Sequence, residues 1–135
     1  MRNLVSFFEI PVVNFNRAVN FYENLLETKL SICEGEEEKM AFFPEDSNVN
    51  GALSYAENFT PGKDGVLIHF NAGGQLDTIL EKAFNNGGKI HTPETKIEAE
   101  GKGSFTIIID SEGNKIGFYL NRPTLSLKNE KAFCS

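Results

Sequence analysis

Residues 14–26, Asn-Phe-Asn-Arg-Ala-Val-Asn-Phe-Tyr-Glu-Asn-Leu-Leu, carry the clearest helical pattern in the chain. Their apolar side chains recur at spacings of three and four residues, so they share one face of an amphipathic helix. Asn14 is a residue type preferred at a helix N-cap, because its side-chain oxygen can accept a hydrogen bond from the first turn. The preceding stretch from Leu4 to Ile10 is mostly apolar and is closed by Pro11, which predicts a buried strand.

The same order of elements is predicted a second time farther along the chain. The helical stripe returns with the same spacing at Leu76, Ile79, Leu80 and Ala83, and Asn86-Gly87-Gly88 after it is a strong C-cap signal. The remaining strands are predicted at 29–34, 38–43, 51–56, 66–70, 89–91, 104–109 and 115–120. This internal repeat predicts an α+β fold of two strand-helix-strand-strand-strand (βαβββ) modules, whose curved mixed sheet surrounds a cavity.

The length of 135 residues matches one domain and leaves no room for a second. Between the modules, Pro61-Gly62 and Asp64-Gly65 are loop-forming pairs, which predicts a hinge at that place. We therefore expect a single domain over 1–135, divided into module one at 1–57, a hinge at 58–65, module two at 66–121 and a tail at 122–135.

Composition excludes several classes of partner. A net charge of −6 argues against a nucleic-acid-binding surface, which needs clustered Lys and Arg. No stretch approaches the apolar length of a membrane span, and the N-terminus has no signal-peptide core. Cys33 and Cys134 lie outside any disulfide or metal motif, so we expect reduced thiols. The sequence predicts a cytoplasmic protein without a nucleic-acid or membrane partner.

Several short motifs occur in the order and spacing of a known superfamily. They are Phe7-Phe8-Glu9-Ile10-Pro11, Asn14, Arg17-Ala18 and Phe21-Tyr22 in the first half, and Asn86-Gly87-Gly88-Lys89-Ile90, Pro93-Glu94-Thr95 and Asp110-Ser111-Glu112-Gly113-Asn114-Lys115-Ile116-Gly117 in the second. Over residues 3 to about 120 the chain resembles the vicinal oxygen chelate superfamily of glyoxalases, bleomycin-resistance proteins and ring-cleaving dioxygenases. The phrase Phe-Glu-Ile-Pro is typical of its branch of predicted enzymes related to lactoylglutathione lyase. The resemblance implies a glyoxalase-like fold, a small-molecule ligand and a homodimer.

In the metal-dependent members of that superfamily, His, Glu or Gln side chains at four positions bind a divalent ion that acts as a Lewis acid. Carried onto this sequence, the first position falls on Phe7 and the last on Gly117. The closest match to the second is Ser54, and the third falls on Ile68 or Leu67, depending on the register chosen. None of these side chains is a usual metal ligand, so we expect no resident metal and no other cofactor.

The chain has only two histidines, and neither is expected at a cavity position. His69 is next to the third ligand position, but a shift of one residue turns a strand side chain to the opposite face of the sheet. His91 follows Ile90 near a strand end, where exposure to solvent is the simplest interpretation. The sequence therefore predicts no metal role for either residue.

Glu9 is the preferred polar residue of the predicted cavity, because it lies two residues beyond Phe7 and shares its face of the strand. Its carboxylate is expected to act as a general base, to bind a cationic group of a ligand, or to pair with a backbone or Arg donor. Counting in steps of two from Gly117 places Lys115 and Tyr119 on the cavity side as well. The complete set of ligand-binding candidates is Phe7, Glu9, Met40, Phe42, Ser54, Tyr55, Ile68, Phe105 and Tyr119.

Three functions remain open at this point. The first is a glyoxalase-like protein that binds a small organic ligand without a fixed metal and uses Glu9 in lyase or isomerase chemistry. The second is a non-catalytic sequestering, resistance or sensing module. The third is a metal-dependent enzyme similar to lactoylglutathione lyase, whose ligands lie elsewhere or come from the other subunit of a dimer. The sequence does not decide whether the protein is an enzyme.

Overall fold

A computed structural model of the chain describes residues 4–45, 49–72, 76–97 and 103–120. The elements of module one are β1 (Phe7–Pro11), α1 (Phe15–Leu26), β2 (Ser31–Glu34), β3 (Lys39–Phe42) and β4 (Asn50–Tyr55). Those of module two are β5 (His69–Asn71), α2 (Leu76–Asn85), β6 (Lys89–Lys96), β7 (Ser104–Ile109) and β8 (Lys115–Leu120). The predicted tail at 122–135, with Cys134, lies outside the described residues. Within the described ranges, no helix is long and apolar enough to cross a membrane.

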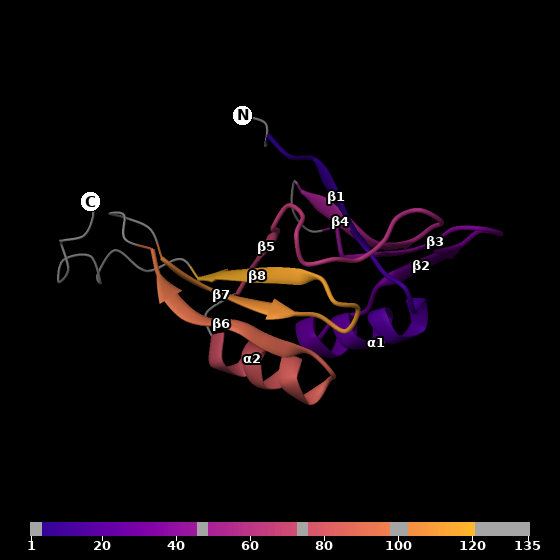
Figure 1. Cartoon of the computed structure of the whole chain (residues 1–135). Helices are drawn as coiled ribbons and strands as arrows, with labels where there is room; N and C mark the ends of the chain where they lie inside the picture. The colour runs from indigo at the N-terminus through magenta and orange to yellow at the C-terminus, as the bar shows by residue number, and fades with distance from the viewer. Residues whose placement is uncertain (1–3, 46–48, 73–75, 98–102, 121–135) are drawn as a thin grey trace.

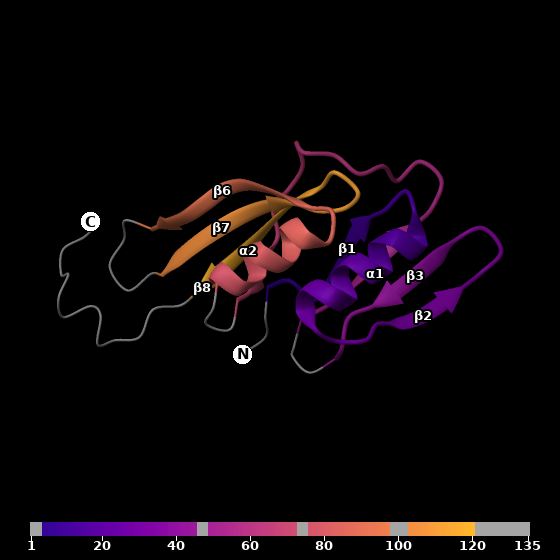
Figure 2. The same ribbon diagram turned by 90° about the horizontal axis from the view of Figure 1, so that it is seen from below.

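Each module has its own four-stranded sheet, and both sheets have the same topology. The strand order is β1-β4-β3-β2 in sheet A and β5-β8-β7-β6 in sheet B. In each sheet the first strand of the module pairs parallel to the last, whereas the other pairs are antiparallel. Helices α1 and α2 lie next to each other on one side of the two sheets (Figures 1 and 2). The predicted α+β fold of two βαβββ modules is confirmed.

The helices begin and end as their sequences predict. Strands β1, β2, β3 and β5 are each two residues shorter than predicted, whereas β6 is longer. Asn14 Oδ1 accepts a hydrogen bond from the backbone N–H of Arg17 at 3.0 Å, and Gly87 after α2 has a φ of 100°. Strand β5 is limited to three residues, and β6 continues to Lys96 rather than ending at residue 91. Pro93 is tolerated in β6 because it falls at a register shift against β7, where its missing N–H interrupts no regular ladder.

The two modules share one hydrophobic core. Phe70 of β5 packs against Phe8, Tyr22 and Phe43 of module one, with ring-centroid distances of 5.9, 6.2 and 5.4 Å. The ring of Phe118 of β8 stacks on the same ring, with 5.6 Å between the centroids. Because these rings come from both halves of the sequence, the modules stabilise each other and are expected to unfold together.

A turn of module two also binds the beginning of helix α1. Glu112 Oε1 accepts hydrogen bonds from the backbone N–H groups of Val13 and Asn14 at 2.9 and 2.8 Å. The guanidinium of Arg17 donates to Glu112 Oε2 at 2.8 Å and to Oε1 at 3.1 Å. A carboxylate at a helix N-terminus satisfies free N–H groups and interacts favourably with the helix dipole. This turn therefore holds the two modules in register.

The close approach of α2 to strand β7 predicts that Gly88 does not tolerate a side chain. A Cβ on Gly88 would lie 2.8 Å from the carbonyl oxygen of Ile109 and 3.1 Å from that of Ala83. We expect Gly88→Ala to lower the free energy of unfolding by about 1–3 kcal/mol, because backbone atoms must move. The matched control is Gly65→Ala, since a Cβ there would meet nothing within 4 Å. Equal urea midpoints for the two variants would show that the packing at Gly88 is not tight.

Candidate functional site

The side of sheet A that faces away from α1 carries most of the residues predicted to line the site. The strand register places Phe7 beside Asn50, Glu9 beside Ala52, and Met40 beside Ser54. The alternate residues point toward the helix, and Ala41 and Leu53 among them are fully buried. We call the outward surface the Glu9 face; it consists of Phe7, Glu9, Met40, Phe42, Asn50, Ala52 and Ser54.

A buried serine holds the carboxylate of Glu9. Ser54 is 3% exposed, and its hydroxyl donates to Glu9 Oε1 at 2.7 Å. Within the described part of the chain, Glu9 has no other hydrogen-bond or ionic partner. One carboxylate oxygen is therefore fixed while the other is free to accept a hydrogen bond from a ligand.

A second free acceptor lies on the same face. Asn50 Oδ1 is buried and has no hydrogen-bond partner. The side chain is directed to the Glu9 face because its neighbour Gly51 lies toward the core, where a Cβ would meet the ring of Phe8. Sequence reasoning did not select Asn50, although counting back by two from Ser54 reaches it through Ala52. A buried unpaired acceptor is costly, so it indicates a position where a hydrogen-bond donor is expected.

Aromatic side chains border these polar groups. The rings of Phe7 and Phe42 lie 6.4 Å apart at an interplanar angle of 43°, and Phe7 is 42% exposed. Tyr55 follows Ser54 directly and has its ring on the other side of the sheet, although it still contributes to the predicted wall where the hollow described below is formed. The ammonium of Lys39, its strand partner, lies 5.7 Å from the Tyr55 ring centroid and 5.8 Å from that of Phe15 on α1.

Two hollows meet at Glu9. The smaller, which we call the Glu9 hollow, has a volume of about 390 Å³ and is lined by Glu9, Glu38, Lys39, Met40, Ser54, Tyr55, Ala56 and Phe59. The larger, the linker pocket, has a volume of about 670 Å³ and lies between β1, the 59–68 segment and the start of β8. Glu9 and Phe59 line both.

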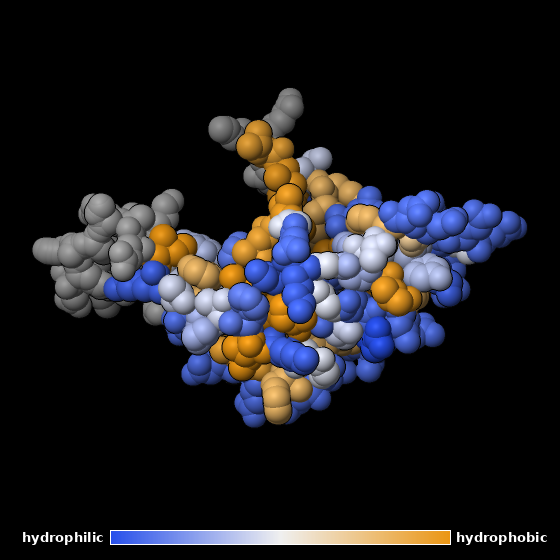
Figure 3. Space-filling view, viewed as in Figure 1, coloured by the Kyte–Doolittle hydropathy of each residue, from blue (hydrophilic) through white to orange (hydrophobic). Residues whose placement is uncertain are grey.

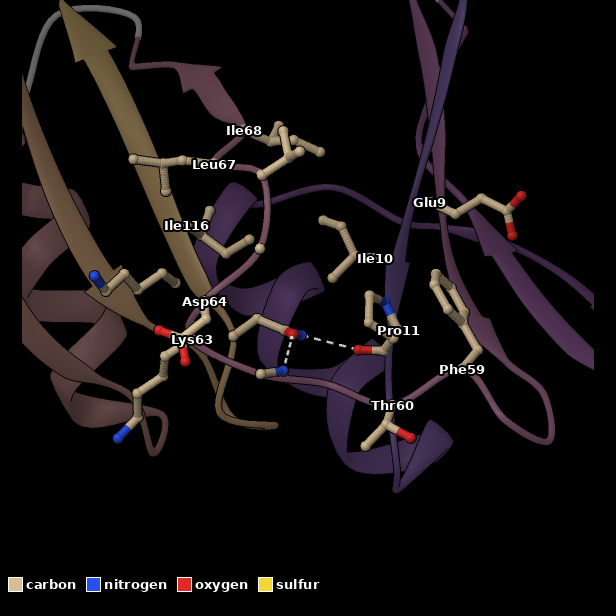
Figure 4. Close-up of a pocket in the computed structure, with 15 residues that line it drawn as sticks. Glu9, Ile10, Pro11, Phe59, Thr60, Lys63, Asp64, Leu67, Ile68 and Ile116 are labelled. Carbon is tan, nitrogen blue, oxygen red and sulfur yellow. Dashed lines mark hydrogen bonds between the residues drawn. The ribbon is translucent and has the colours of Figure 1, made fainter.

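The linker pocket is mainly aliphatic at its centre. Figure 4 shows Ile10 and Ile116 pointing toward each other across it, with Leu67 and Ile68 above them. Asn114 closes one corner, since its Nδ2 donates to the carbonyl oxygen of Pro11 at 2.8 Å and its Oδ1 accepts from Gly62 N at 3.1 Å. The Glu9 side chain points away from these groups on the other side of β1 (Figure 4). The Glu9–Ser54 pair therefore belongs to the smaller hollow, although the linker pocket is larger.

Other predicted site residues lie on the corresponding face of sheet B and not beside Glu9. Phe105 pairs with Tyr119, and the Tyr119 hydroxyl accepts a hydrogen bond from Gly103 N at 3.0 Å. His69 pairs with Gly117, and its ring covers that glycine so closely that a Cβ there would lie 2.3 Å from Nδ1. Burial lowers the pKa of His69 from its ordinary value of 6.5, which favours the neutral ring.

The structure also fixes how the two modules correspond. The N–H of Val12 donates to Ser54 O at 3.0 Å, and the equivalent bond runs from Ala72 to Tyr119 at 2.9 Å. Counting back along the strands from these bonds aligns Leu67 with Phe7, so that His69 corresponds to Glu9. Counting from the helices gave Ile68 as an alternative, because the segment between β5 and α2 is one residue longer than that between β1 and α1.

These positions do not fit a resident divalent metal. Phe7, Leu67 and Gly117 have no ligating group, and the Ser54 hydroxyl is bonded to Glu9. Over residues 4–45, 49–72, 76–97 and 103–120, no three His, Cys, Asp or Glu side chains are grouped to hold an ion. His91 is exposed on β6, where its Nδ1 lies 2.8 Å from Thr92 Oγ1.

Comparison with known proteins identifies the fold. No protein-family model matches the chain, and no curated protein matches it by sequence. A glyoxalase/bleomycin resistance protein from Albidiferax ferrireducens superposes with a TM-score of 0.71 at 19% identity, covering 90% of this chain and 100% of that one. A glyoxalase-related enzyme from Fulvimarina pelagi gives 0.67 at 12% identity and 88% of both chains.

The fosfomycin resistance protein FosX from Listeria monocytogenes is also similar, with a TM-score of 0.66, 16% identity, and coverage of 96% of this chain and 100% of that one. At these identities the likeness concerns the fold, and it does not single out the lactoylglutathione lyase branch. The chain therefore has the fold of the glyoxalase and bleomycin-resistance proteins, as its sequence motifs predicted.

Proposed function

We propose that this protein binds a small organic molecule on the Glu9 face and does so without a resident divalent metal. The observation that carries the proposal is the Glu9–Ser54 pair, in which a carboxylate with one free oxygen borders a hollow of about 390 Å³. A few fixed polar groups beside apolar and aromatic walls are typical of small-molecule sites. The similar structures named for bleomycin and fosfomycin resistance support a ligand-binding role for this fold.

Binding without turnover agrees better with this face than lyase or isomerase chemistry. If Glu9 acted as a base and removed a proton from the carbon next to a carbonyl group of the ligand, negative charge would develop on the carbonyl oxygen. That oxyanion needs hydrogen-bond donors or a Lewis acid. In the Glu9–Ser54 pair the hydroxyl proton is directed to Glu9, so the pair offers a ligand a free acceptor, the second carboxylate oxygen, and no free donor for an oxyanion. Catalysis by Glu9 is therefore the second candidate.

We also propose that the protein acts as a homodimer. The chain leading into β1 is apolar surface, visible at the N-terminal end in Figure 3, and Leu4, Val5 and Phe7 are 102%, 53% and 42% exposed. Such a run is a poor solvent-facing surface but a good interface. Sedimentation velocity over a range of concentrations is expected to give a dimer, and a monomer at every concentration would contradict this part.

A cytoplasmic location, in which the exposed Cys33 stays reduced, remains a prediction.

Metal analysis and ligand binding together test the proposed function. Protein purified without chelators is expected to contain well under one equivalent of divalent metal and to bind a hit from a small-molecule library whether or not EDTA is present. Glu9→Gln is expected to weaken that binding about tenfold, because a charge-assisted hydrogen bond becomes a neutral one. Glu81→Gln, an exposed change on α2, is the control. A stoichiometric divalent metal whose removal abolishes ligand binding would contradict the proposal. Turnover of a ligand by the wild-type protein that is lost in Glu9→Gln would favour the second candidate, catalysis by Glu9.

A further inference from the structure

We propose that the ligand of the Glu9 face carries a protonated amine with N–H donors, attached to an apolar body that includes a ring. This inference rests on the proposed function and specifies its ligand class. It follows from the hydrogen-bonding character of the face, from its aromatic border and from its balance of charge.

The free carboxylate oxygen of Glu9 is complementary to a hydrogen-bond donor. Ser54 binds one oxygen of this carboxylate and leaves the other free at the edge of the hollow. A primary ammonium group has a positive charge, three N–H donors and no acceptor, so it matches this carboxylate. A ligand hydroxyl would bring a donor without the opposite charge, and a ligand carboxylate would add like charge.

The surroundings suit a cation on an apolar body. The Phe7 and Phe42 rings border the face, and Phe59 lines the hollow. Aromatic faces attract ammonium groups electrostatically, in addition to covering the apolar part of a ligand. The volume of about 390 Å³ is at the small end of ligand pockets, so the expected body is one ring and not a larger skeleton.

The charges around the hollow also favour a cation. Its described lining contains two carboxylates, Glu9 and Glu38, and one cation, Lys39. The Lys39 ammonium does not neutralise Glu9, because it lies over the rings of Phe15 and Tyr55 on the other side of sheet A. The protein as a whole carries a net charge of −6, which favours the approach of a cationic ligand.

Three matched probes test the inference: benzylamine, benzyl alcohol and benzyltrimethylammonium, titrated at neutral pH and low salt with backbone amide shifts as the readout. Benzylamine is expected to bind at least about tenfold more tightly than benzyl alcohol and about threefold more tightly than the quaternary ion, which has a charge but no N–H donor. Glu9→Gln is expected to remove about tenfold of the benzylamine affinity and to leave that for benzyl alcohol nearly unchanged. Glu38→Gln removes the other carboxylate of the Glu9 hollow. Because Glu38 is exposed, this second variant tests the effect of negative charge on benzylamine affinity without risk to folding.

The outcomes separate this inference from the proposed function. If benzyl alcohol binds the Glu9 face as tightly as benzylamine, the amine assignment is overturned while small-molecule binding there stands. Equal binding of benzylamine and the quaternary ion would overturn the requirement for N–H donors. If no probe shifts the amides of the Glu9 face although library compounds do, the amine inference alone falls; if neither does, the proposed function falls as well.

Discussion

Replacement of Phe70 by alanine is expected to lower the free energy of unfolding by about 3–5 kcal/mol, the usual cost of deleting a core phenylalanine. The ring lies at the centre of an aromatic cluster, with partners in both modules, namely Phe8, Tyr22, Phe43 and Phe118. Its removal leaves a cavity that neither sheet can fill alone, because the partners are held by separate strands and by α1. The loss is therefore expected to affect both modules together.

Urea denaturation followed by far-UV circular dichroism and by tyrosine fluorescence measures this effect. Both signals are expected to shift to the same lower midpoint, since the shared core makes unfolding one transition. Phe84→Ala is the matched control, because Phe84 on α2 is 69% exposed and its loss is expected to cost less than about 0.5 kcal/mol. Separate midpoints for the two signals in wild-type protein would contradict a common core.

Acid is expected to destabilise the protein through Glu112. Hydrogen bonds from Arg17 and from the N–H groups of Asn14 and Val13 hold the pKa of Glu112 at about 2, against an ordinary value of 4.5, although burial alone would raise it. A lowered pKa in the folded state stabilises the protein above pH 4.5, and this stabilisation is lost as the pH falls through the folded value of about 2. After allowance for the exposure of its Arg17 partner, we expect Glu112→Gln to cost about 2 kcal/mol at pH 7.

The pH dependence distinguishes this role from simple packing. The difference in stability between wild type and Glu112→Gln is expected to shrink steadily between pH 5 and pH 2.5, by the linkage of proton binding to folding. Asp110 in the same turn has the opposite effect on the pH dependence of stability, because burial raises its pKa above 3.8. The pH dependence of the wild-type protein alone would therefore not isolate the contribution of Glu112. A difference that stays constant with pH would mean that the Glu112 charge does not stabilise the junction.

The fold was predictable because its signals are local and repeated. The apolar spacing of residues 15–26, the Asn14 cap and the glycines after α2 each specify one boundary, and the structure has all three. The lengths of β5 and β6 were not predictable in the same way. The length of a strand depends on which neighbouring strand is available for pairing. In a sequence, Pro93 indicates the end of a strand, and only the irregular pairing with β7 explains why β6 continues past it.

The candidate site was predictable where a period of two applies along one strand. Glu9 follows Phe7 on the same face for that reason, and Ser54 reaches it from the adjacent β4. Tyr55 has its ring on the opposite face because it directly follows Ser54. His69 takes the position equivalent to Glu9, on the face of its sheet that was not expected for it, because the helix and strand registers of the repeat differ by one residue. Asn50 was missed because an unpaired acceptor is a property of packing, which the sequence pattern does not contain.

The most direct test of the account is a map of backbone amide shifts on adding a mixed library of small organic molecules to metal-free protein. The Glu9 face is the predicted binding surface, so the largest changes are expected at Phe7, Glu9, Asn50 and Ser54, and they should need a higher ligand concentration in Glu9→Gln. Changes confined to the linker pocket around Ile10 and Ile116, or to sheet B around His69, or seen only after a divalent metal is added, would contradict it.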